Sequence, residues 1–313
     1  MLKLILRRVL WSIPLLLVAS LLTFVLVSLI PGNPAQAILG VTATPAQVAA
    51  LQKQLGLDQS LWAQYWHWLT HALGGDLGSS LITGQAVTSY LGQRLSATLD
   101  LIVGGTLVAA ALGLILGVLA ATRGGWTGRL VQLGAVLGLA VPNFWLALLL
   151  IELFAVVIAV LPATGYVPFT QSSGLWLRSL VLPVTAIAAG ATTFIAVQTR
   201  DAMLEAFRRD FVRVLAANGI PRRSVVWRHA LRNAAIPVVT SIGVTFVGLF
   251  GGTVLVESVF AIPGLGSGLA TAASQHDIPV IQGTVVCFTL IVVVVNLLVD
   301  IAYGFLDPRV RVS

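Results

Sequence analysis

The polar stretch around which this chain is organised is residues 200–235, which read RDAMLEAFRRDFVRVLAANGIPRRSVVWRHALRNAA. It holds eight of the eighteen lysine and arginine residues, and long apolar runs flank it on both sides. A polar connection of about 35 residues between two apolar segments is too long to be a simple turn. We therefore interpret this stretch as the place where the protein meets a partner.

The rest of the chain has the composition of a membrane protein. Of its 313 residues, 58% are hydrophobic and only 9% are charged, whereas about a quarter are charged in an ordinary soluble domain. Six apolar runs are each long enough to cross the hydrocarbon core, which takes about 20 residues. They are residues 9–30, 101–122, 130–151, 179–199, 233–256 and 278–299. We expect an all-α fold with six transmembrane helices, the third of them extending to Val160.

Two features of the N-terminal half complete this outline. A cleaved signal peptide is an alternative for the first run, but its apolar part exceeds the roughly 7–15 residues of a signal peptide. After the first run, Thr44-Pro45 predicts the start of a short helix that ends at Gly56. A second helix over residues 60–73 carries three tryptophans and a tyrosine, so we expect it to lie along the outer membrane surface.

The expected organisation has four segments. Residues 1–30 form the N-terminal tail and first span, residues 31–96 an external segment with short interfacial helices, residues 97–306 a five-helix core that includes the polar stretch 200–235, and residues 307–313 a tail.

Basic residues predict the orientation of the chain. With the N-terminus in the cytoplasm, fifteen of them are cytoplasmic and only Lys53, Arg94 and Arg178 are outside. This bias is typical of inner-membrane proteins and places both termini in the cytoplasm. It also accounts for the net charge of +7 without nucleic acid. We expect a cysteine at position 74 to react from outside and one at position 225 only from inside.

Within the polar stretch, the residue order predicts a helix, a turn and a second helix. Residues 210–218 have helical composition, with Asp210 at the favourable N-terminal end. Gly219 is typical of a left-handed stop after a helix, and Pro221 can begin the next helix. That helix continues from Ser224 into the fifth span.

The polar stretch contains the motifs DFVR (210–213) and HALRNA (229–234), together with Gly219 and Pro237. Further motifs occur in order along nearly the whole chain: IPGNP (30–34), LGLD (55–58), QY (64–65), GDLGS (75–79), RLSATL (94–99), PNFW (142–145), Glu257 with Phe260, PGLG (263–266), DIPVIQ (277–282), NLLVD (296–300) and DPR (307–309). In this ordered set of motifs, the sequence resembles the integral membrane permease subunits of bacterial ABC importers for peptides and nickel.

This resemblance implies a type I ABC importer permease fold in the bacterial inner membrane. It implies that the helix before Gly219 is a coupling helix seated on a cytoplasmic ATPase. The implied partners are two ATPase subunits, a second homologous permease, an external solute-binding protein and membrane lipid. ATP and magnesium are expected on the ATPases, with no cofactor on this chain, which is a transport subunit and not an enzyme. The candidate coupling residues are Asp210, Phe211, Arg213, Ala216, Ala217, Gly219, His229, Arg232 and Asn233.

One departure from the family concerns the segment just before the glycine. Family members often carry basic residues there, whereas this chain has LAAN at residues 215–218. Which side chains touch the ATPase therefore stays open.

The resemblance favours di- or oligopeptides as cargo, with nickel or a metal chelate as the alternative. Asn143 and Glu152 are candidates for the substrate path because polar residues within spans are often functional. A secondary transporter without ATPases is the alternative class, but neither inverted repeats nor midplane charges are evident.

Other patterns favour structural roles. Residues 263–266 lack the lysine ending of a phosphate-binding loop. Ser267 with His276 does not have the placement of an intramembrane protease. His67 and His71 are spaced to share a metal ion, but no third ligand is near them. The small residues at 186–191 and 248–252 are expected to be helix-packing surfaces.

Overall fold

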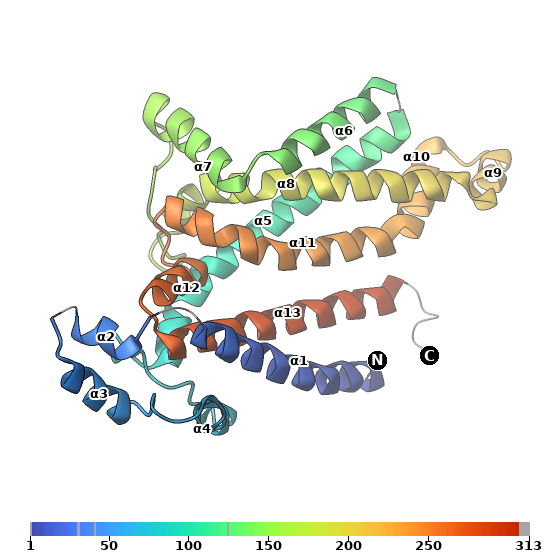
Figure 1. Ribbon diagram of the computed structural model, residues 1–313. Coiled ribbons are helices and arrows are strands. Elements are labelled where there is room, and N and C mark those ends of the chain that lie inside the picture. Colours follow the sequence, from blue (N-terminus) through green and yellow to red (C-terminus); the bar gives the residue numbers. More distant parts are fainter. Residues whose placement is uncertain (1, 30–31, 41, 124, 307–313) are drawn as a thin grey trace. The chain divides into compact units, whose positions relative to one another are not determined.

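The computed structural model describes residues 2–29, 32–40, 42–123 and 125–306, and its regular elements are helices (Figure 1). Residues 30–31 and the expected tail 307–313 lie outside this part. The chain forms two compact units. The membrane unit comprises Ala97–Ile262 and the end of α13 (Ile278–Leu306) from Val294. The second unit comprises Leu2–Ser96 and Pro263–Val293. It is called the external-segment unit because it contains residues 31–96, which the sequence predicts to be external, although it also includes α1 (Leu2–Ser28) and much of α13.

Five helices are long and apolar enough to cross a membrane, which confirms five of the six expected spans. They are α1 (Leu2–Ser28), α5 (Val87–Arg123), α8 (Ser173–Arg208), the helical run Arg222–Val259 that ends in α11 (Leu231–Val259), and α13. At about 1.5 Å per residue, α8 with its 36 residues is roughly 54 Å long. The hydrocarbon core is about 30 Å thick, so α8 must extend well beyond it.

The third expected span is two helices, so the prediction of one helix as far as Val160 is wrong. α6 (Gly125–Ala140) and α7 (Asn143–Ile151) are separated at Pro142, and a π-helical segment (Glu152–Val157) follows α7. Pro142 is extended, with ψ of 137°. Proline lacks an amide hydrogen and disfavours helix in the preceding residue, so the chain breaks there.

Close glycine contacts bring α5 and α8 together in the membrane unit. A Cβ atom on Gly105 or Gly113 would lie within 2.7–2.8 Å of Ile187 or Ile195. On Gly117 it would lie 2.6 Å from the carbonyl oxygen of Ala196. Small residues let membrane helices approach backbone to backbone, and α8 packs in turn on α6, α7 and α11.

The external-segment unit contains α1, α2 (Pro34–Leu39), α3 (Pro45–Gln54), α4 (Leu61–Leu73) and α12 (Leu265–Ser274). The predicted start of α3 is confirmed, because Thr44 and Gln47 form a reciprocal capping box. α4 agrees with the helix predicted over residues 60–73, and Ser60 caps its start, whereas α2 was not predicted. The Tyr65 hydroxyl lies 2.9 Å from Ser20 Oγ and ties α4 to α1.

A buried carboxylate joins two distant parts of the same unit. Asp277 is 3% exposed and accepts hydrogen bonds from the Ser80 hydroxyl and from the Leu81 amide. Beside it, an apolar core includes Val87 at the start of α5 and Leu265 on α12. Charge-assisted bonds to a buried acceptor are strong, so they fix the connection between α12 and α13 on the segment that precedes α5.

Candidate functional sites

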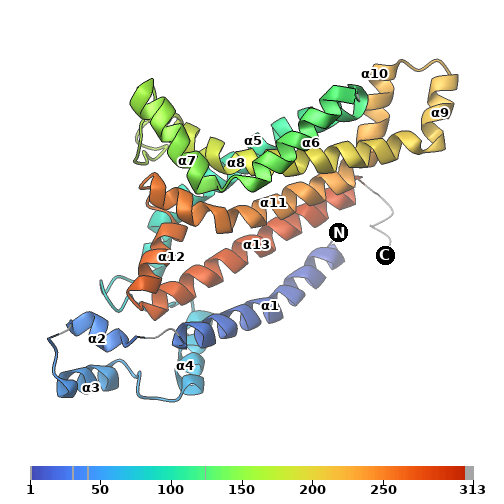
Figure 2. The ribbon, with the colours of Figure 1, turned by 45° about the horizontal axis from the view of Figure 1, so that its top comes forward.

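The polar stretch is not a loop, because the two flanking helices continue into it. α8 runs to Arg208, and the next helical run begins at Arg222. Between them lies α9 (Asp210–Ala217), which confirms the predicted helix. Figures 1 and 2 both place α9 and α7 at opposite ends of α8.

The turn after α9 has the predicted left-handed conformation. Gly219 has φ of +73°, its amide donates to the Ala216 carbonyl at 3.1 Å, and the Ile220 amide donates to the Leu215 carbonyl at 3.1 Å. Glycine adopts this conformation without the steric cost of a Cβ atom. Pro221 directly precedes the short helix α10 (Arg222–Ser224), as expected.

A buried cluster of apolar side chains joins the helices that flank α9 in the chain. Met203 and Ala206 of α8 pack with Val118 of α5 and with Val226 and Ala230 of the π-helical segment Val225–Ala230. Three helices therefore meet at this point and form a stiff base. Stiffness matters because a connection that bends cannot transmit a displacement.

Polar contacts add to this base. Arg222 donates to the Thr122 carbonyl at 3.0 Å and links the turn to α5. In the returning helix, His229 Nδ1 lies 3.1 Å from the Ser224 carbonyl, and the Asn233 amide donates to the His229 carbonyl at 2.9 Å. His229 and Asn233 thus shape the π-helical turn, while Arg232 is exposed.

α9 has an inward face and an outward face. Phe211, Val212 and Leu215 are half-buried, and α9 contacts the π-helical segment Val225–Ala230. The outward side chains are those of Asp210, Arg213, Val214, Ala216 and Ala217.

The outward face offers little charge but a small apolar surface. The carboxylate of Asp210 and the guanidinium of Arg213 are 3.5 Å apart and almost fully exposed, and such pairs contribute little to stability. Val214 is 57% exposed. Trp227 is 49% exposed and belongs to the π-helical segment Val225–Ala230, which α9 contacts. Sequence reasoning missed both residues, although an isolated valine on the polar side of an amphipathic helix is a readable signal.

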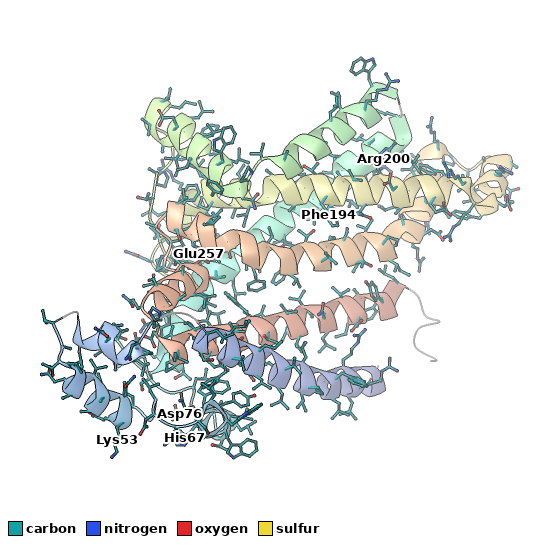
Figure 3. The ribbon with its side chains drawn as sticks, in the orientation of Figure 1. Lys53, His67, Asp76, Phe194, Arg200 and Glu257 are labelled. Atoms are coloured by element: carbon teal, nitrogen blue, oxygen red, sulfur yellow. The ribbon has the colours of Figure 1, made fainter. Side chains whose placement is uncertain are left out.

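A second candidate site is a cavity of about 450 Å3 in the membrane unit. It lies where the break before α7 meets α8 and α11, and Asn143, Phe194, Thr245 and Gly248 help to line it. Thr245 Oγ1 is buried and has no hydrogen-bond partner among the described residues. Figure 3 labels Phe194 on α8, between Arg200 toward the α9 end and Glu257 toward the other end of this unit.

The two residues predicted to line the substrate path, Asn143 and Glu152, do not line the same cavity. Asn143 begins α7 and lines the cavity, whereas Glu152 is exposed at the end of α7 and does not line it. The expected packing role of residues 186–191 agrees with the burial of Ala186 and Ala188, but Gly190 and Ala191 line the cavity. The predicted packing role is not met by all of residues 248–252. Gly248 lines the cavity, and no described atom lies within 4 Å of a Cβ atom built on Gly248.

Two carboxylates hold the far end of the membrane unit together. Glu257 is fully buried and accepts a hydrogen bond of 2.7 Å from Thr98, which links α11 to α5. Asp100 accepts bonds of 2.7 Å from Tyr166 and from the Trp176 indole. The sequence singled out Glu257 only as part of a motif, and it did not single out Asp100.

Enzyme and metal alternatives gain no support. Among the described residues, no group of three histidine, cysteine or acidic side chains could hold a metal ion. His71 Nδ1 lies 2.8 Å from the His67 carbonyl, within the same helix. Ser267 lies on α12, where its hydroxyl donates to the Gly264 carbonyl.

Comparison with known proteins identifies the family. Residues 113–312 match the family described as "Binding-protein-dependent transport system inner membrane component", and residues 1–102 match its N-terminal family. The chain belongs to this family. The permease is 41% identical over 312 residues to a peptide transport system permease protein of Brucella abortus, with 99% of each chain covered.

Other relatives span the permease equally fully. A peptide ABC transporter permease protein of Sinorhizobium fredii is 38% identical, with 98% of each chain covered. The glutathione transport system permease protein GsiC of Salmonella typhimurium is 38% identical, with 99% of each covered. In fold, the permease is similar to a chain of the inward-facing MetNI methionine ABC transporter, with a TM-score of 0.56 and 18% identity. That match covers 70% of this chain and 97% of the other.

Proposed function

We propose that this permease subunit imports short peptides as half of the membrane pathway of an ATP-driven transporter. The observation that carries the proposal is the similarity, over the full chain, to permeases named for peptides and glutathione. The membrane cavity agrees with this cargo. The described residues that line it are apolar apart from Asn143 and Thr245 and include no histidine, cysteine or carboxylate, which are the ligands that transition metals prefer. Peptide is therefore favoured over nickel.

In this proposal α9 is the coupling helix. Its outward residues Asp210, Arg213, Val214, Ala216 and Ala217 would contact an ATPase subunit, and Phe211 would anchor the helix from within. The buried base formed with α5, α8 and the returning helix would carry ATPase movement to the spans. The full transporter would contain a second permease, two ATPases that bind ATP and magnesium, and an external solute-binding protein.

The proposed orientation places α9 and both termini in the cytoplasm and residues 31–96 outside. To test it, Gly74→Cys and Arg223→Cys are made separately in a Cys287→Ala background, which removes the single native cysteine. In intact cells a membrane-impermeant maleimide should label position 74 at once and position 223 only after permeabilisation. Position 223 replaces position 225 because Val225 is buried, at 6% exposure. The opposite labelling pattern would reverse the topology.

Peptide import predicts that the membrane cavity controls uptake. Asn143→Leu combined with Thr245→Val should reduce uptake of radiolabelled trialanine by roughly thirtyfold, because the two lost hydrogen bonds cost about 1 kcal/mol each. Uptake is measured in cells that express the whole transporter and lack other peptide importers. Thr185→Val is the matched control, since its hydroxyl bonds within α8 and it lines a different surface. Uptake of radioactive nickel in place of trialanine would refute the peptide assignment.

A further inference from the structure

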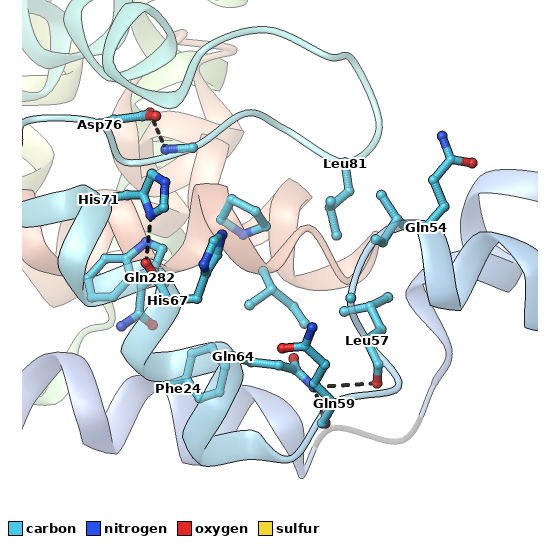
Figure 4. A pocket seen from close by; sticks show the side chains of 16 residues that line it. Phe24, Gln54, Leu57, Gln59, Gln64, His67, His71, Asp76, Leu81 and Gln282 are labelled. Carbon is cyan, nitrogen blue, oxygen red and sulfur yellow. Dashed lines mark hydrogen bonds between the residues drawn. The ribbon is translucent and has the colours of Figure 1, made fainter.

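The external-segment unit contains a cavity of its own, with a volume of about 470 Å3 (Figure 4). Its walls come from α1, from the turn between α3 and α4, from α4, from the segment before α5 and from the start of α13. The volume falls within the range of roughly 300–1,000 Å3 that is typical of small-molecule sites. Its lining shares no residue with the membrane cavity.

Two buried polar atoms of residues that line this cavity have no hydrogen-bond partner within the described part of the chain. Gln282 is 1% exposed, and its amide nitrogen donates to the Ser20 carbonyl at 2.7 Å, but Oε1 accepts nothing. Trp68 Nε1 is buried and donates to nothing. Buried polar groups are nearly always paired, so an acceptor and a donor here together indicate a ligand with the complementary pair.

The other polar groups of the wall narrow the chemistry of the ligand. The Gln64 amide is occupied, since it donates to the Gln59 carbonyl at 2.8 Å. His67, His71 and Asp76 belong to the same wall (Figure 4). Among the described residues that line the cavity, the Asp76 carboxylate is the one acidic group, and none is a lysine or an arginine. These groups suit a neutral or ammonium-bearing ligand and disfavour an anion.

We propose that this cavity binds a short free peptide through its main chain. A peptide unit carries an N–H donor for Gln282 Oε1 and a carbonyl acceptor for the Trp68 indole. An N-terminal ammonium group is attracted to Asp76. The choice of peptide, rather than another amide, rests on the proposed function. The site would hold cargo on the external segment, separately from the membrane cavity.

Direct binding to the assembled transporter tests this site. The complex, without its solute-binding protein, is placed in lipid nanodiscs, and binding of radiolabelled trialanine is measured by equilibrium dialysis. Trp68→Phe removes the indole N–H together with part of the ring, and it should weaken binding about five- to tenfold, as expected for one lost hydrogen bond. Gln282→Leu should weaken it at least as much. Trp66→Phe is the matched control because Trp66 lies on the same helix and is 66% exposed.

Each outcome bears on this site independently of transport. If the peptide occupies the external cavity, Trp68→Phe and Gln282→Leu should weaken trialanine binding more than Asn143→Leu does. Loss of binding with Asn143→Leu but not with the two external-cavity variants would assign the binding to the membrane cavity and overturn the inference. Absence of saturable binding, or equal losses with Trp66→Phe and Trp68→Phe, would also overturn it. Normal trialanine uptake together with such a result would leave peptide import intact.

Discussion

Removing residues 210–219 should leave the permease in the membrane but abolish its association with the ATPases. The deletion takes away α9 and its glycine turn, while the buried base of Met203, Val226 and their neighbours remains. Membrane insertion depends on the apolar spans, which are unchanged. The measurement is co-purification of the ATPases with an affinity-tagged permease, and maleimide labelling at position 74 checks insertion.

A point substitution on the outward face of α9 sharpens this test. Val214→Asp should weaken ATPase binding by roughly thirtyfold or more, because burying an unpaired carboxylate in an apolar contact costs several kcal/mol. The side chain is 57% exposed in the isolated chain, so the permease itself should fold normally. Glu205→Gln on the exposed side of α8 is the control and should bind as the unchanged permease does. Normal co-purification with Val214→Asp would place the ATPase contact elsewhere.

Gly117→Leu should be the most destabilising single change in the membrane unit. A Cβ atom at this position would lie 2.6 Å from both the Ala196 carbonyl oxygen and Thr199 Cβ. One of these neighbours is backbone, so a side-chain rotation cannot relieve the clash and α5 must move away from α8. Overpacking of this kind typically costs about 1–3 kcal/mol, and more where backbone must shift. We expect the unfolding temperature in detergent to be strongly lowered. It is measured by size-exclusion chromatography of samples heated to a series of temperatures.

Gly92→Leu is the matched control for this prediction. It lies on the same helix, and nothing is within 4 Å of a Cβ built on Gly92. The substitution also replaces a poor helix former with a good one, so the unfolding temperature should stay the same or rise. Equal destabilisation by Gly92→Leu and Gly117→Leu would show that the effect does not come from the contact between α5 and α8.

Features set by neighbouring residues could be predicted well. Apolar run length predicted five spans, and the local signals Thr44-Pro45 and Gly219 predicted a cap and a turn that the structure contains. The helix over residues 210–217 was likewise predicted from composition and its two ends. Pro142 is a local signal for a helix break as well. The apolar composition on both sides of this proline nevertheless favoured the prediction of one continuous helix.

Features that depend on contacts between distant residues could not be predicted in this way. The spacing of Gly113 and Gly117 is a known packing pattern, yet only the fold shows that α8 is the helix that fills it. The labelling prediction had assumed that Val225 is exposed, whereas the fold buries this side chain to 6% exposure.

By itself, the sequence of residues 200–235 determined a polar segment with a helix, a glycine turn and a second helix, because hydropathy, capping and backbone preference act over a few residues. Tertiary structure alone decided that α8 and the returning helix extend into this segment on a shared buried base, and that Val214 faces outward. It also brought Trp68 and Gln282 to the wall of one cavity. The physical reason is that burial and hydrogen-bond pairing depend on contacts between segments far apart in the sequence. Local conformational preferences do not specify those contacts.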